Sequence, residues 1–233
     1  YLALFNDDQQ THIENIIVNS YCDFTFKAEY YKSNTHPLRH YMIYPLGFKG
    51  DDDINAFGPR VFDVAWKIAE VASDKTTLDK NCIDMVINRI IDNSAVAIAS
   101  LNRNPVISAR GMAIAHKRKV GATIYGLNSK LNFDCEWAAW ANGTAVRELD
   151  FHDTFLAADY SHPADNIPPI LAVAQQMNKS GSDLIRALAT GYEIQIDLVK
   201  GICLTEHTVD HIAHLGPSFS AGLCSLLYLA TDS

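Results

Sequence analysis

The 233-residue chain lacks the features that mark several large classes of protein. It has no sustained basic run, and its formal net charge is −8, which argues against binding to the phosphate backbone of nucleic acids. No run of about 18 apolar residues is present, as a membrane-spanning helix would need. The motifs GxGxxG, Walker A and GxSxG and the protein-kinase motif set are also missing. We therefore expect neither nucleic-acid nor membrane partners.

Cysteine is scarce, and its pattern indicates the redox environment. The five cysteines include no CxxC pair and are odd in number: Cys22, Cys82, Cys135, Cys203 and Cys224. This usage favours buried thiols in a reducing compartment over a disulfide framework or a zinc knuckle. We expect Cys203 and Cys224, which lie in apolar helical sequence, to be buried. The expected location is the cytoplasm, with the mitochondrial matrix as the alternative.

The chain divides into two parts that differ in residue composition and in helical periodicity. Apolar residues make up 48 % of it and charged residues 20 %, which is typical of a globular protein. Residues 1–60 are rich in Tyr, Asn, Asp and turn signals and show no helical period, so we expect an atypical N-terminal extension. Residues 61–233 repeat apolar side chains at threes and fours, which predicts an all-α domain.

The expected helices cover most of this second part. Their ranges are 61–72, 78–102, 106–117, 135–146, 166–178, 180–202 and 218–230, with a short strand or extended link at 120–126. The helix over 135–146 is apolar on nearly every side, which predicts burial in a helical core. We expect Trp66, Trp137 and Trp140 to be core residues and not stacking partners of a cofactor.

The stretch ELDFHDTFLAADYSHPADN, from position 148, crowds acids and histidines between two apolar helices. If the preceding helix continues, Asp150, Asp153 and Thr154 share one face. One of two such close carboxylates has a raised pKa and suits acid–base chemistry near neutral pH, while the threonine hydroxyl holds a substrate oxygen. Pro163 ends any helix, which leaves His162 in a turn facing a cavity. The alternative is a solvated helix–loop junction.

A second cluster, TEHTVDHIAHLGP, spaces His207, His211 and His214 at i, i+4 and i+7. If the segment is helical, the three imidazoles share one face and suit zinc. The sequence reads HTVDH, however, so the glutamate of the HExxH motif is missing. Two alternatives stand beside a metal site: histidines at a surface junction, and acid–base use of one histidine.

From about Val61 to the last residue, the chain resembles the MmgE/PrpD family, and within it the 2-methylcitrate dehydratases. The segments that carry the resemblance are NRIIDNSAVAIASLNR, GATIYG, EWAAWANGTAVRELDFHDTFLAADYSHPADNIPPILAVAQQ, GYEIQIDLVKGICLTEH and DHIAHLGPS. The resemblance implies a large helical domain whose companion, a small α+β domain, would come from later sequence, so we expect a truncated chain. It also implies a homodimer and dehydration of a hydroxy-tricarboxylate in the methylcitrate cycle of propionate catabolism, without metal or other cofactor.

The resemblance also assigns site residues. Asp150 and Thr154 match the family's D…T motif, His162 matches the histidine of its HP, and His214 matches a later active-site histidine. Together with those four catalytic candidates we expect substrate binding by Arg147, Asp153, Lys200 and His211. The alternatives are a cis-aconitate decarboxylase, which shares the D-F-x-D-T…HP pattern, a non-catalytic remnant, and a metal-dependent hydrolase built on the cluster from His207 to His214.

Overall fold

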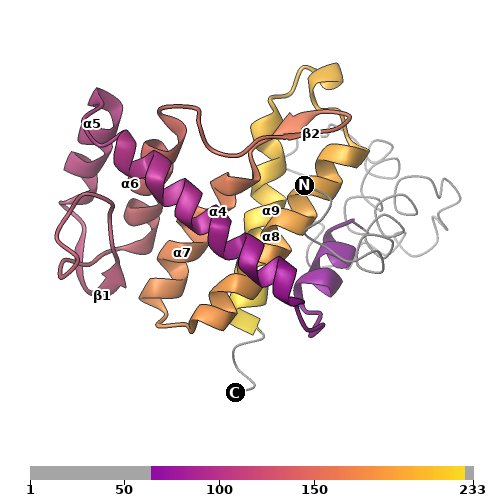
Figure 1. The fold of residues 1–233 in the computed structure, drawn as a ribbon, viewed down its shortest axis with the longest axis horizontal. Helices are drawn as coiled ribbons and strands as arrows, with labels where there is room; N and C mark the ends of the chain where they lie inside the picture. The colour runs from indigo at the N-terminus through magenta and orange to yellow at the C-terminus, as the bar shows by residue number, and fades with distance from the viewer. Residues whose placement is uncertain (1–63, 229–233) are drawn as a thin grey trace, which may run out of the picture.

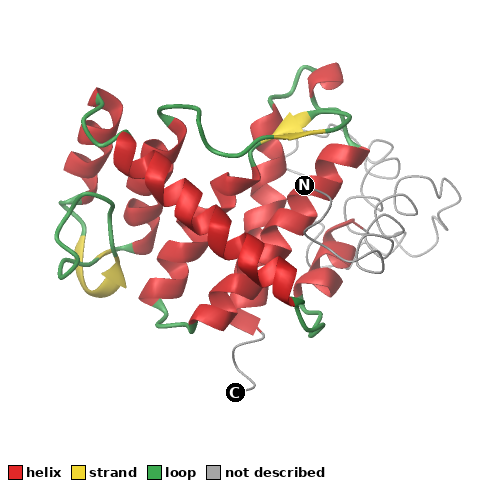
Figure 2. Ribbon diagram, viewed as in Figure 1, coloured by secondary structure: helices red, strands yellow, loops and turns green. Residues whose placement is uncertain are grey.

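The computed structural model of the protein describes residues 64–228, so the expected extension over residues 1–60 lies outside the described part. This part is mainly helical, as Figure 2 shows, which confirms the all-α prediction. A helix over residues 64–72 is followed by α4 (Lys80–Ala99), α5 (Asn104–Ala113), β1 (Lys117–Ala122), α6 (Cys135–Arg147), β2 (Phe155–Leu156), β3 (Tyr160–Ser161), η2 (Pro163–Asn166), α7 (Ile167–Gln176), α8 (Gly181–Gly201), η3 (Thr205–His207), η4 (His211–His214) and α9 (Leu215–Tyr228).

Local sequence signals set the ends of the long helices. At the start of α4, the Asp79 carboxylate accepts a hydrogen bond from the backbone N–H of Cys82 at 2.8 Å. At the start of α8, Ser180 and Asp183 form a reciprocal capping box. Each cap satisfies a backbone N–H that has no partner inside its helix. Pro105 stands in the first turn of α5, where its missing N–H does no harm.

Helix α8 lies at the centre of the fold, because nearly every side chain from Ala187 to Val199 is buried. In Figure 1, α4 runs diagonally across the front, where it contacts α6 and α8. The largest apolar core joins α4, α7, α8 and α9. At Gly222 of α9, an added Cβ would lie 2.7 Å from the carbonyl oxygen of Ala187, so the close approach of α8 and α9 requires glycine there.

Strands play a small part. The strand β1 covers residues 117–122, starting earlier than the predicted segment at 120–126, and it makes isolated bridges to Phe133. Strands β2 and β3 form an antiparallel hairpin with Phe155 opposite Ser161 and Leu156 opposite Tyr160. This hairpin lies within the predicted acidic stretch that begins at position 148, and β3 contacts both α8 and η4.

A buried polar network anchors the hairpin to the helices. Gln195 of α8 donates a hydrogen bond to Ser161 of β3 and accepts one from Asn166 of η2. Ser218 of α9 lies 3.1 Å from both Asn166 Oδ1 and Gln195 Oε1. Buried side-chain networks of this kind favour a single arrangement, because a misplaced partner leaves a polar group without a hydrogen bond.

Two expectations about the core are wrong. Trp66 and Trp140 are 70 % and 57 % exposed, so α6 is not buried on every side, whereas Trp137 is half-buried and stacks on His116 at 4.0 Å. The helix over residues 64–72 packs through Ile68, Val71 and Ala72, which leaves Trp66 on another face.

The cysteine expectation also fails, because Cys203 is half-buried and Cys224 is exposed. Most of the buried residues of α9 are small, whereas Cys224 lies on an exposed side of the helix. Together with Trp66, Cys224 lines an apolar hollow of about 690 Å³. None of the helices in the described range is both long and apolar enough to cross a membrane.

Candidate functional site

The acidic stretch after α6 is a loop, which corrects the prediction of a continued helix. Helix α6 ends at Arg147, and Asp150 has a φ of +54°, a left-handed conformation that aspartate tolerates better than most residues. The loop turns Asp150 outward, with its side chain 72 % exposed, and turns Asp153 inward, where it is buried. The two carboxylates therefore do not share a helical face.

Asp153 is held on both oxygens. Its Oδ1 accepts a hydrogen bond from the backbone N–H of Ala164 at 2.8 Å, and its Oδ2 accepts one from the hydroxyl of Tyr192 at 2.9 Å. Burial raises the pKa of Asp153, and these two hydrogen bonds act in the opposite direction. The raised carboxylate pKa that the sequence predicts is thus present, but its cause is burial and not a second carboxylate nearby.

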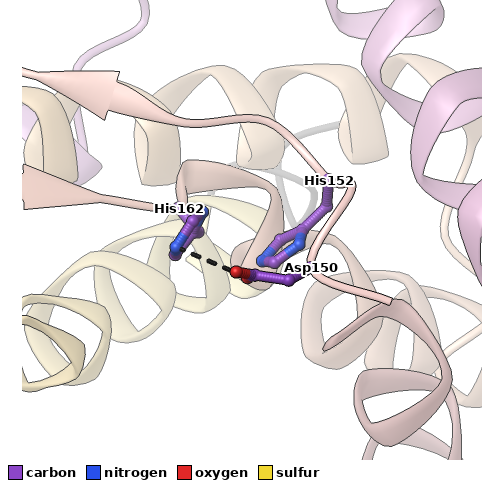
Figure 3. Close-up of side chains that lie close together, drawn as sticks. All are labelled: Asp150, His152 and His162. Carbon is purple, nitrogen blue, oxygen red and sulfur yellow. Dashed lines mark ion pairs between the residues drawn. The ribbon is translucent and has the colours of Figure 1, made fainter. Parts of the chain in front are cut away.

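His162 stands directly before η2, which Pro163 opens, so the proline does not end a helix as expected. Its Nδ1 lies 2.8 Å from the backbone carbonyl of Asp153 and 3.3 Å from Thr154 Oγ1. Because a carbonyl only accepts hydrogen bonds, Nδ1 carries the proton, and Nε2 of the neutral ring keeps its lone pair. Figure 3 shows His162 directed toward the carboxylate of Asp150, with Nε2 3.9 Å from Oδ1.

His152 belongs to the same cluster, and the sequence reasoning missed it. Its buried ring packs against that of His162 with centroids 4.4 Å apart. Its Nε2 lies 3.0 Å from Arg147 Nη1 and 3.3 Å from Asp165 Oδ1, and Arg147 also contacts Asp165 at 3.3 Å. The available signal was its place between Asp150 and Asp153 in the acidic stretch.

The predicted helical face of three histidines does not form. Residues 205–214 make two short 3₁₀ turns, η3 and η4, and Thr208 between them has a φ of +58°. His207 is exposed, whereas His211 and His214 are buried. The ring of His211 lies 5.5 Å from that of His162, centroid to centroid, so this segment contributes to the same site as the acidic loop.

Asp159, at the tip of the β2–β3 hairpin, holds the histidine segment in place. Its carboxylate accepts hydrogen bonds from the backbone N–H of Leu204 at 2.9 Å and from the hydroxyl of Thr205 at 3.0 Å. Burial acts to raise the pKa of Asp159, but these bonds and one from the N–H of Tyr160 lower it below its ordinary value. The ring of Tyr160 packs on His211 with centroids 4.2 Å apart.

Three buried ring nitrogens in this region have no hydrogen-bond partner: His152 Nδ1, His211 Nε2 and His214 Nε2. Burial lowers the pKa of His214, although the charge of Asp159 and a hydrogen bond with the backbone of Ile202 act in the opposite direction. Because buried polar atoms are nearly always paired, these nitrogens are available to bind water or a polar ligand.

The charges around the cluster are mixed, because the carboxylates of Asp150 and Asp165 lie beside Arg147 and the histidines. One ligand atom each from Asp150, His152 and His162 lies within 4.8 Å of the others, a spacing compatible with a metal ion. The guanidinium of Arg147 lies 3.0 Å from His152 Nε2 and brings a fixed positive charge to the same place, where it also pairs with Asp165 at 3.3 Å. Arginine and imidazole N–H groups are suited to bind carboxylates.

Most of the predicted site residues lie in this region of the fold. The loop after α6 supplies Asp150, Asp153 and Thr154, α6 supplies Arg147, and the segments around the hairpin supply His162, His211 and His214. Lys200 has other partners than these site residues. Its ammonium pairs with Asp197 on the same helix at 3.0 Å, and its charge lowers the pKa of the carboxyl of Glu193. Asp165, Asp159 and Tyr192 are additional residues whose roles depend on contacts between distant segments.

Comparison with known proteins identifies the family of the chain. Residues 63–233 match the family profile described as MmgE/PrpD N-terminal domain. A 2-methylcitrate dehydratase of Cupriavidus necator is 29 % identical over 122 residues, which are 48 % of this chain and 25 % of that enzyme. A probable 2-methylcitrate dehydratase of Saccharomyces cerevisiae is 33 % identical over 107 residues, 40 % of this chain and 21 % of that protein.

A mitochondrial 2-methylcitrate dehydratase of Yarrowia lipolytica is 30 % identical over 101 residues, 39 % of this chain and 19 % of that enzyme. The matches therefore span about a quarter or less of the length of these relatives. The family match, in contrast, covers all of the described residues, which form a helical fold. The chain belongs to the MmgE/PrpD family.

Proposed function

We propose that the protein is a hydro-lyase that removes water from 2-methylcitrate, or a closely similar hydroxy-tricarboxylate, by acid–base catalysis without a metal ion. Water elimination needs a base for a weakly acidic C–H, an acid for the departing hydroxyl, and positive or hydrogen-bonding groups for the carboxylates. The products are the unsaturated tricarboxylate and water, so no oxidant or reductant takes part. The names of the relatives support this reaction class.

The observation that carries the proposal is the orientation of His162. Its Nδ1–H is held by the carbonyl of Asp153 at 2.8 Å, so Nε2 has a free lone pair next to the carboxylate of Asp150 at 3.9 Å. A histidine with one nitrogen fixed is a prepared proton acceptor. In the proposal His162 and Asp150 move the protons, and Thr154 orients a substrate oxygen.

Cationic and N–H groups around this pair suit the substrate's carboxylates. Arg147 and the unpartnered ring nitrogens of His152, His211 and His214 supply them in the proposal. The geometry makes Asp153 a poor candidate for direct substrate contact, because both of its oxygens already accept hydrogen bonds. Lys200 is an equally poor candidate, because it pairs with Asp197.

We also propose that the protein forms a homodimer in the cytoplasm or the mitochondrial matrix. The exposed side chains of Ile87, Ile91 and Ile98 recur on one face of α4, an apolar surface that a second copy would cover. Substituting Ile91 with lysine is expected to shift the mass measured by light scattering from dimer to monomer. A wild-type protein that is monomeric at all concentrations would contradict the dimer.

The test of the reaction is an assay of the purified protein with 2-methylcitrate and with citrate in the presence of EDTA, following the ultraviolet absorbance of the unsaturated product. We expect turnover in the wild type and its loss in Asp150→Asn and in His162→Ala, with His207→Ala as a matched control that stays active because His207 is exposed. A folded protein that converts neither compound would refute the proposal. Release of carbon dioxide would indicate a decarboxylase instead.

A further inference from the structure

Asp153 and Tyr192 connect the buried middle of α8 to the imidazole of His162. Tyr192 is buried and donates its hydroxyl hydrogen to Asp153 Oδ2 at 2.9 Å. The other carboxylate oxygen of Asp153 binds the N–H of Ala164, and its backbone carbonyl binds Nδ1 of His162, each at 2.8 Å. Asp153 thus makes hydrogen bonds with His162 and Ala164, the residues on both sides of Pro163. It also accepts a hydrogen bond from Tyr192, which is 39 residues away in the chain.

We propose that Tyr192 and Asp153 are positioning residues that fix the tautomer and the direction of His162. The predicted changes in kcat rest on the proposed function, whereas the predicted tautomer of His162 does not. The geometry of the His162 ring can be measured without any substrate.

The physical reason is the selectivity of the Asp153 peptide carbonyl. It accepts a hydrogen bond only from a protonated Nδ1, so keeping this carbonyl against His162 keeps the lone pair on Nε2. The carbonyl stays there because the side chain of the same residue is tied at both oxygens. If Tyr192 loses its hydroxyl, Oδ2 of a buried carboxylate loses the hydrogen bond from that group, which is costly in an apolar interior. The loop relaxes toward solvent, and the carbonyl moves away from His162.

Other titratable groups also face His162 and set the background for any pH measurement. Among the described residues they are Asp150 from the loop at 3.9 Å, His152 with Arg147 and Asp165 behind it, Tyr160 of β3 with ring centroids 6.4 Å apart, and His211 of η4. None of them is altered by removing the hydroxyl of Tyr192. A change seen in that variant therefore reports on the contact through Asp153.

The experiment compares Tyr192→Phe with the wild type by NMR of the protein labelled with ¹⁵N in histidine, with His162→Gln used to assign the signal. In the wild type we expect neutral His162 to carry its proton on Nδ1. In Tyr192→Phe we expect the Nε2–H form to appear, and the acidic limb of the kcat–pH profile to move. We also expect kcat to fall about tenfold with little change in KM, since one ordinary hydrogen bond corresponds to roughly that factor in rate.

A matched control separates this effect from general loss of stability. Tyr125→Phe also removes one tyrosine hydroxyl from a partly buried contact, which lies 2.9 Å from Oγ of Ser94 in α4. It should lower stability by a similar amount and leave the His162 signal and the pH profile unchanged.

Two results would overturn the proposal. One is a wild-type His162 protonated on Nε2 when neutral, a measurement that needs no variant to fold. The other is a Tyr192→Phe protein with an unaltered His162 signal and pH profile. If the His162 signal responds as expected in a protein that shows no turnover, the positioning role stands and the proposed hydro-lyase function fails.

Discussion

The carboxyl of Glu193 on α8 makes the stability of the protein depend on pH. Burial, and to a smaller extent the carboxylates of Asp197 and Asp74, raise the pKa of Glu193, while Lys200 lowers it, and the net result is a rise from 4.5 to about 8. The folded protein therefore holds this proton more tightly than the unfolded chain. The associated stability is fully present below the unfolded pKa of about 4.5 and is lost as the pH rises through about 8.

The size of the effect follows from the two pKa values. At about 1.4 kcal/mol per pH unit, a rise from 4.5 to about 8 has an upper bound of roughly 5 kcal/mol. Because the side chain is half-buried and keeps some solvent contact, we expect about 2–4 kcal/mol between pH 5 and pH 8. Glutamine has nearly the same shape and cannot ionise, so Glu193→Gln should lack this loss.

The assay is urea unfolding of the wild type and of Glu193→Gln at pH 5, 6, 7 and 8. The free energy of unfolding of the variant, relative to the wild type, should rise steadily with pH, while titrating groups that do not interact with Glu193 cancel in the difference. Glu136→Gln is a control, because Glu136 is exposed in the first turn of α6. Parallel curves for the wild type and Glu193→Gln would show that burial of Glu193 does not alter its ionisation, and the reasoning would fail.

Three further predictions concern the packing of the fold, each measured by chemical unfolding. Gly222→Ala should destabilise the protein by about 1–3 kcal/mol, because the new Cβ would lie 2.7 Å from the carbonyl oxygen of Ala187; an unchanged midpoint would mean that α8 and α9 separate freely. Ser180→Ala should lose about 1 kcal/mol with its capping box, and a neutral result would deny the cap a role. Gln195→Leu should lose about 1–3 kcal/mol because buried Ser161, Asn166 and Ser218 each lose the hydrogen bond to Gln195, whereas an equally stable variant would show the network to be dispensable.

The helices were predictable because their signals are local. Apolar side chains at threes and fours, the Ser180–Asp183 cap and the proline in the first turn of α5 act within a few residues, and each helix that they predict in the described range is present. The wrong predictions concern which side of a helix is buried. Trp66 and Trp140 look like core residues by composition, but which face of a helix is buried depends on its neighbours, and these two side chains face outward.

For the candidate site, too, the sequence predicts some features correctly and others wrongly. The sequence by itself determined which chemical groups are available, namely carboxylates, a threonine hydroxyl and imidazoles in two short stretches, and through them the family. It suggested helical geometry for both stretches, and both are loops or 3₁₀ turns, since the left-handed residues Asp150 and Thr208 interrupt any helix.

Only the tertiary structure decided how these groups meet. It separates outward Asp150 from buried Asp153, brings His211 to His162, and leaves His207 in solvent. The physical reason is that an imidazole's tautomer and direction depend on the atoms packed around it. For His162 these atoms include the carbonyl of Asp153, whose side chain is held in turn by Tyr192, and no spacing along the chain encodes that contact.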